Sequence, residues 1–137
     1  MDTSSYNIFL CRLQNILIKR IHAIMNEMLN KSHISSSELE ELLKEREAGK
    51  VDFLLVDVRE QMEYDSAHIK GVDSLNPTST FQSWGEKFFE EKREKVVIFT
   101  CRTGSRSGQV QNVFRQNGME NVINHSGGIV SFRGETE

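Results

Sequence analysis

Two short runs of apolar residues constrain the fold of this chain more than any other feature. They are Phe53-Leu54-Leu55-Val56-Asp57-Val58 and Lys95-Val96-Val97-Ile98-Phe99-Thr100. Such runs are typical of strands buried on both faces, which occur in parallel sheets covered by helices. Helical patterns alternate with them along the chain, and this alternation predicts an α/β fold. We expect a small parallel sheet of about four to five strands with helices on both faces.

Weaker signals fill in the rest of this predicted fold. Pro77 breaks the chain before a helix whose aromatic residues, Trp84, Phe88 and Phe89, have helical spacing and are expected in the core. Gly118 is expected to end another helix. The remaining predicted elements are helices over 60–66 and 107–116, strands over 72–75 and 122–123, and a turn at Gly127-Gly128.

The N-terminal part carries two helix signals. Apolar residues spaced three and four apart over residues 6–30 predict an amphipathic helix with a wide apolar stripe. Ser35 and Glu38 then form a capping box, flanked by Ile34 and Leu39 as a hydrophobic staple, and this second helix is expected to stop near Gly49. We therefore divide the chain into a helical extension over 1–32 and a domain over 33–137.

Three uses of the first helix compete. It packs on the domain, pairs with its copy in a homodimer, or lies on a membrane surface. The basic residues Arg12, Lys19 and Arg20 support a membrane surface, but they form no dense cluster, so we rank it last. Because one small domain hardly covers so wide a stripe, the sequence favours a homodimer. Cys11 is then expected to be a buried or interface thiol rather than a resolving partner for the second cysteine.

Composition and charge exclude several classes of protein. A chain of 137 residues with 37% hydrophobic residues forms a core without disulfides or metals, and a net charge of −3 gives no reason to expect nucleic-acid binding. Cys11 and Cys101 are far apart and lack zinc spacing, which favours free thiols in a reducing compartment. Residues 8–20 match neither a signal peptide nor a membrane-spanning helix, so we expect a cytoplasmic protein.

The second apolar run leads directly into a loop that carries a candidate reactive cysteine. The loop is Cys101-Arg102-Thr103-Gly104-Ser105-Arg106, followed by Ser107 and a predicted helix. Ligands bind at the carboxyl ends of strands in such sheets, and successive backbone N–H groups in a tight loop favour an anion. The positive end of the following helix and two arginines add to this field. The sequence therefore predicts that Cys101 is ionised near neutral pH and acts as a nucleophile.

Four segments of the chain resemble the rhodanese domain, in order and with matching spacing over about residues 33–134. Leu55-Val56-Asp57-Val58-Arg59 is similar to its Asp-x-Arg element, and residues 63–71, which contain His68-Ile69-Lys70-Gly71, are similar to its Glu-Tyr and His-Ile-x-Gly stretch. Residues 97–107 resemble the active-site strand and loop, and residues 118–128 resemble the closing strand with its Gly-Gly turn.

The resemblance implies a thiosulfate sulfurtransferase. Cys101 would take a sulfane sulfur from a donor such as thiosulfate, become a persulfide, and pass the sulfur to cyanide or a thiol. Arg106 would brace the loop or neutralise the bound anion, and Arg102 would face the donor. The resemblance implies no cofactor. The amides that would cradle the persulfide are those of Arg102, Thr103, Gly104, Ser105, Arg106 and Ser107.

Other functions remain open beside this one. The chain is alternatively a persulfide carrier or interaction module that serves a sulfur-relay protein. A phosphatase or arsenate reductase is less expected, because phosphatases of this general fold place five residues between cysteine and arginine, and four lie between Cys101 and Arg106.

Three further polar residues have mainly structural interpretations. Asp57 either orients the loop through one of its arginines or forms a structural ion pair or strand-end cap, and we favour the structural role. The resemblance suggests a scaffold role for both Asp57 and Arg59. His68 and His125 are expected to be structural rather than catalytic.

Overall fold

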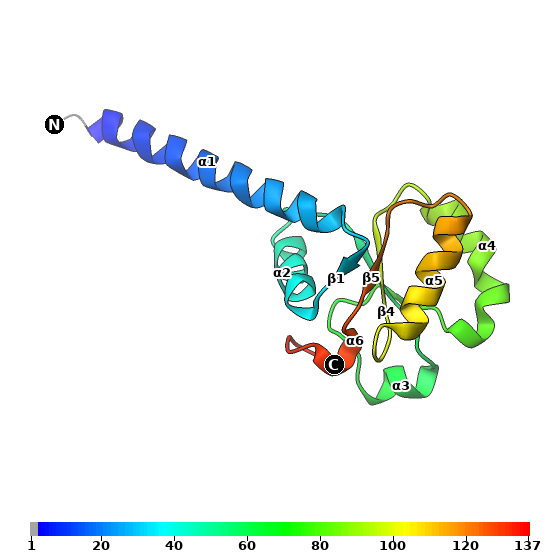
Figure 1. Ribbon diagram of the computed structural model, residues 1–137. Helices are drawn as coiled ribbons and strands as arrows, with labels where there is room; N and C mark the ends of the chain where they lie inside the picture. Colours follow the sequence, from blue (N-terminus) through cyan, green and yellow to red (C-terminus); the bar gives the residue numbers. More distant parts are fainter. Residues whose placement is uncertain (1–2) are drawn as a thin grey trace.

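The computed structural model describes residues 3–137, and its centre is a five-stranded, wholly parallel sheet with strand order β1-β5-β4-β2-β3. The predicted α/β fold is confirmed (Figure 1). The strands are β1 (His33–Ile34), β2 (Leu54–Asp57), β3 (Ser74–Leu75), β4 (Val97–Thr100) and β5 (Val122–His125). The helices are α1 (Thr3–Leu29), α2 (Ser36–Glu47), α3 (Gln61–Ser66), a 3₁₀ turn (Thr78–Thr80), α4 (Phe81–Lys92), α5 (Ser105–Gln116) and α6 (Gly128–Ser131).

The sheet separates two hydrophobic clusters, as expected for strands buried on both faces. Successive residues of β4 alternate between them: Val97 and Phe99 belong to the cluster beneath α4 and α5, and Ile98 belongs to the cluster beneath α2. Phe88 of α4 is buried in the first cluster, with Trp84 and Phe89 packed against it. The prediction that these aromatic residues form core rather than a binding platform is therefore correct.

Helix α2 begins as the sequence predicts. The Ser35 side chain accepts the Glu38 N–H and the Glu38 carboxylate accepts the Ser35 N–H, which completes the capping box. Ile34 and Leu39 on either side are both buried in the second cluster. This start places α2 across one face of the sheet.

Two short elements lie outside the prediction, and one helix starts earlier. Strand β1 has two residues and pairs with β5, which follows it by about ninety residues, so no local pattern marks it. Helix α6 is a single turn that begins at Gly128. Helix α5 starts at Ser105 rather than 107, because Gly104 at φ +95° turns the chain into the helix two residues sooner.

Helix α1 extends away from the rest of the chain (Figure 1). Only its last two turns pack on the second cluster, through the buried Met25 and the partly buried Ile21, Met28 and Leu29. Cys11 is exposed on the free part of α1, so its thiol is not buried within the single chain, and the alternative of an interface thiol stays a prediction. No helix within residues 3–137 is long and apolar enough to cross a membrane.

Candidate active site

Cys101 lies directly after β4, at the carboxyl end of the central strands. Its thiol sulfur accepts the Gly104 N–H at 3.1 Å and the Ser107 hydroxyl at 3.3 Å. The residue is 1% exposed, while Arg102, Thr103 and Ser105 of the same loop are exposed. The loop thus curls around the sulfur and directs two hydrogen-bond donors toward it, and the sulfur itself is closed off from solvent.

The closing turn holds the loop in this shape. The N–H groups of Ile129 and Val130 donate to the carbonyls of Cys101 and Arg102 at 2.9 and 3.2 Å. A Cβ on Gly128, which has φ +64°, would collide with the Arg102 carbonyl. Glycine is therefore required here by both the backbone conformation and the close approach of the loop.

Asn124 of β5 is a site residue that no local sequence pattern indicates. Its side-chain oxygen lies 2.6 Å from the Ser107 hydroxyl oxygen and shares the single hydroxyl proton with the Cys101 sulfur, and its amide nitrogen donates to the Gly104 carbonyl at 3.1 Å. It therefore positions the two residues that donate to the Cys101 sulfur. Asn124 is separated from the loop by the whole of α5, so only the pairing of β5 with β4 brings it there.

The surroundings of the sulfur favour the thiolate. Burial raises the pKa of the Cys101 thiol, but hydrogen bonds from the Ser107 hydroxyl and from the nearby backbone N–H groups outweigh burial, so the pKa lies below its ordinary value. Because these donors stabilise negative charge on sulfur, the predicted nucleophile has the electrostatic environment that its chemistry requires.

We expect the Cys101 thiolate to titrate with a midpoint below the value of about 8.5 for a free cysteine. Ultraviolet absorbance of the thiolate against pH, with Cys101→Ser as the blank, measures this midpoint. Ser107→Ala removes one donor to the sulfur and is expected to move the midpoint upward. A wild-type midpoint at or above about 8.5, or one that Ser107→Ala leaves unchanged, contradicts this assignment.

Arg106 is bound by Glu63 of α3. Its two terminal nitrogens each donate to one Glu63 carboxylate oxygen at 2.7 Å, a bidentate pair. The Arg106 guanidinium holds the pKa of Glu63 down, at about 2. The resemblance implied that Arg106 braces the loop or neutralises the bound anion. The pair with Glu63 corresponds to the first of these roles, the bracing of the loop. Glu63 itself was recognised only as part of a motif.

Asp57 and Arg59 form a buried ion pair with each other. The Arg59 guanidinium donates to Asp57 at 2.8 Å and to the Ala67 carbonyl at 2.8 Å. Asp57 is 1% exposed and Arg59 is 5% exposed. The hydrogen-bond partner of Asp57 is therefore Arg59 rather than an arginine of the loop, in line with the structural role favoured from the sequence, and the pair ties β2 to the C-terminal end of α3.

The two histidines also occupy structural positions. His68 stacks on Tyr64 with ring centroids 3.8 Å apart, and its backbone pairs with Glu137. His125 is fully buried between the hydroxyls of Thr100 and Ser36, and burial lowers the pKa of its imidazole to about 4. None of the hydrogen bonds of either ring reaches the Cys101 sulfur.

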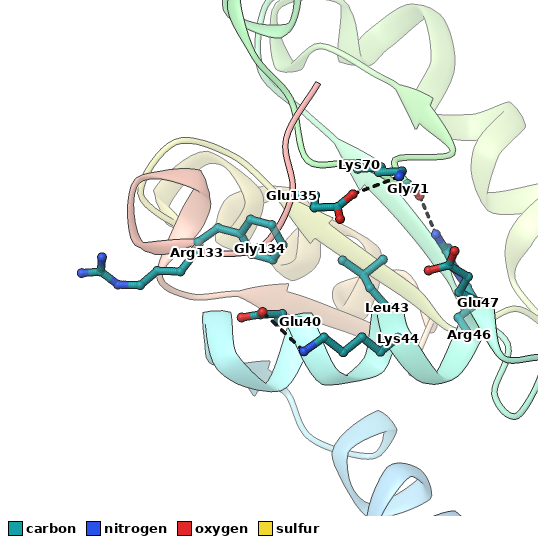
Figure 2. A pocket seen from close by; sticks show the side chains of 11 residues that line it. Glu40, Leu43, Lys44, Arg46, Glu47, Lys70, Gly71, Arg133, Gly134 and Glu135 are labelled. Carbon is teal, nitrogen blue, oxygen red and sulfur yellow. Dashed lines mark hydrogen bonds and ion pairs between the residues drawn. The ribbon is translucent and has the colours of Figure 1, made fainter.

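A cavity of about 600 Å³ lies away from this loop, between α2 and the C-terminal segment (Figure 2). Four of its charged side chains pair with one another: Lys70 with Glu135 at 2.9 Å, and Lys44 with Glu40 at 3.6 Å. Arg46 donates to the Gly71 carbonyl beside it. Among the residues that the structure describes, no cluster of His, Cys, Asp and Glu could hold a metal ion. This cavity is therefore separate from the Cys101 loop, none of whose residues lines it.

Comparison with known proteins relates this fold to a described domain family. The Rhodanese-like domain family model matches residues 38–135. A crystal structure of a rhodanese-like domain protein from Staphylococcus aureus superposes with a TM-score of 0.63 at 25% identity, covering 77% of this chain and 94% of that one. The uncharacterized protein YqhL of Bacillus subtilis is 27% identical over 125 residues, which cover 90% of this chain and 96% of YqhL.

Two longer relatives bear different functional names. The probable adenylyltransferase/sulfurtransferase MoeZ of Mycobacterium tuberculosis is 32% identical over 78 residues, covering 57% of this chain but 19% of MoeZ. The M-phase inducer phosphatase of Dictyostelium discoideum is 32% identical over 88 residues, covering 61% of this chain and 8% of the phosphatase. The chain thus matches only a small part of either protein. The geometry around Cys101 therefore has to distinguish sulfur transfer from phosphoryl transfer.

Proposed function

Because the chain belongs to the rhodanese-like domain family, we propose that it is a sulfurtransferase that carries sulfane sulfur on Cys101. The donor is thiosulfate or a related sulfane compound, and the acceptor is cyanide or a thiol. The observation that carries this proposal is the pair of donors, the Gly104 N–H and the Ser107 hydroxyl, aimed at the Cys101 sulfur. The reaction requires a free thiol, and free thiols persist in reducing compartments. We therefore propose that the protein acts in the cytoplasm.

The reaction proceeds in two displacements. The Cys101 thiolate attacks the outer sulfur of thiosulfate, a new S–S bond forms, and the bond to the sulfonate breaks with its electron pair leaving as sulfite. Cyanide then attacks the outer persulfide sulfur, thiocyanate leaves, and the thiolate returns. The lowered pKa of Cys101 enlarges its thiolate fraction, so no separate side chain has to remove a proton, and the exposed Arg102 faces the anionic donor.

The position of Arg106 argues against phosphoryl transfer. A phosphoryl group needs a guanidinium free to bind its oxygens. Both terminal nitrogens of Arg106 are instead occupied by Glu63. The four-residue spacing from Cys101 also leaves a smaller ring of N–H groups, which suits one sulfur atom better than a phosphoryl group.

The burial of the sulfur favours one second candidate, a persulfide carrier. At 1% exposure of Cys101, a sulfur already bound there lies inside the closed loop and would pass to a partner protein that opens the loop faster than to cyanide or a small thiol. Such a chain would deliver its sulfur to a sulfur-relay protein and would turn over poorly with cyanide.

One experiment separates these functions. The full chain is mixed with thiosulfate and examined by mass spectrometry, then mixed with cyanide while thiocyanate is measured. A sulfurtransferase gains one sulfur atom at Cys101 and produces thiocyanate repeatedly. A carrier gains the sulfur without sustained thiocyanate production, and a chain that gains no sulfur on Cys101 refutes both proposals.

The Glu63–Arg106 pair leads to a separate prediction. Glu63→Gln removes the charge that holds Arg106, and we expect persulfide formation to slow by about tenfold, the loss of one charge-assisted hydrogen bond. Stopped-flow measurement of sulfite release tests this. Asp65→Asn on the same helix is the matched control, because Asp65 contacts Gln61 rather than the loop. Equal rates in the two variants would remove the role of Glu63 in positioning Arg106.

A further inference from the structure

The free part of α1 exposes many large apolar side chains. Eight of them between Ile8 and Ile24 are 41–61% exposed, and no described part of the chain covers them. Six of the eight lie within about a third of the helix circumference at 3.6 residues per turn. These six are Phe9, Leu10, Leu13, Ile16, Leu17 and Ile24.

The charges on the same part of α1 have a single sign. Three of the chain's 17 basic residues, Arg12, Lys19 and Arg20, lie between residues 7 and 26, and none of its 20 acidic residues does. All three are exposed. Arg12 and Lys19 border the apolar side, and Arg20 lies within it, where its long side chain can extend past the apolar atoms to an anionic group.

We propose that α1 lies flat on the surface of an anionic lipid bilayer and holds the domain there. A helix with a broad apolar side and basic residues binds such a surface by burying the apolar side among the acyl chains while its cations meet the headgroups. The anionic cytoplasmic leaflet supplies the complementary charge. This inference does not depend on the chemistry at Cys101.

The same observations count against a second copy of the chain, which the sequence alone favoured. Two copies of α1 would bring only positive charges together. The apolar side is also wider than the seam that one partner helix covers. Ile21 and Met28, which would extend a seam through Leu17 and Ile24, already pack on the domain. A lipid surface has neither restriction, because it is anionic and continuous.

Co-sedimentation of the full chain with phosphatidylcholine vesicles, with and without phosphatidylglycerol, tests this proposal. We expect binding only when phosphatidylglycerol is present, and weaker binding at high salt. Arg12→Gln, Lys19→Gln and Arg20→Gln together should lower the partition coefficient on the order of a hundredfold. The matched control replaces Lys87, Lys95 and Arg115, three exposed basic residues elsewhere, and should bind like the wild type.

The apolar contribution is tested in the same assay. Leu13→Gln with Leu17→Gln is expected to lower binding on the order of a hundredfold, since both side chains leave the acyl region. Met62→Gln with Val113→Gln changes two exposed apolar residues outside α1 and should leave binding unchanged. No binding by the wild type, equal binding to neutral vesicles, or a dimer mass by light scattering without vesicle binding would each overturn the proposal.

Discussion

Replacement of Cys101 by serine is expected to reduce thiocyanate production from thiosulfate and cyanide to background, a loss of at least about a thousandfold. The serine hydroxyl nearly keeps the size of the thiol but stays protonated at neutral pH and forms no persulfide. The Gly104 N–H and Ser107 hydroxyl would still face this position. The loss therefore measures the nucleophile itself rather than the collapse of its loop.

Two further variants test whether the lost activity depends on Cys101 and its hydrogen-bond donor rather than on Cys11. Cys11→Ser is expected to retain wild-type turnover, because Cys11 lies on the exposed part of α1 rather than in the loop. Ser107→Ala is expected to slow turnover about tenfold at neutral pH, since it removes one donor to the thiolate. On acidification, the wild-type rate should fall only as pH drops through the lowered pKa of Cys101, whereas in Ser107→Ala the fall begins at higher pH. Substantial turnover by Cys101→Ser would place the reaction elsewhere.

The central fold followed from local sequence because its strongest signals are local. The runs around Leu55 and Ile98 are apolar at successive positions, and only a strand covered on both faces buries them all. The capping box at Ser35 likewise lies within four residues. Strand β1 escaped detection because its two residues become a strand only by pairing with Asn124 and His125 of β5.

The candidate site shows the same division between local and distant information. The loop around Cys101 is continuous in sequence, so its nucleophile and turn were visible as a pattern. Its supports are distant: Glu63 meets Arg106 across 43 residues, and Asn124 meets Ser107 across 17. The presence of a carboxylate or an amide in the sequence does not indicate which distant residue it will contact. For Asp57, the two alternatives were resolved by geometry, because the neighbouring Arg59 folds back onto it at the end of β2.

The Asp57–Arg59 pair is expected to dominate the stability of the site. Arg59→Met removes the guanidinium and leaves the Asp57 carboxylate buried without its partner, which costs about 3–5 kcal/mol of the free energy of unfolding. The carbonyl of Ala67 also loses its donor. Urea denaturation followed by circular dichroism measures the change. Lys44→Met is the matched control, because its exposed i,i+4 pair with Glu40 contributes about 0.5 kcal/mol or less.

A second substitution shows whether the cost arises from the unpaired charge. Asp57→Asn added to Arg59→Met removes the stranded carboxylate, so the double variant should be more stable than Arg59→Met alone. If the guanidinium acted mainly through the Ala67 carbonyl, the second substitution would recover nothing. If Arg59→Met were no more costly than Lys44→Met, the pair would not hold β2 to α3, and the position of Glu63 against Arg106 would need another support.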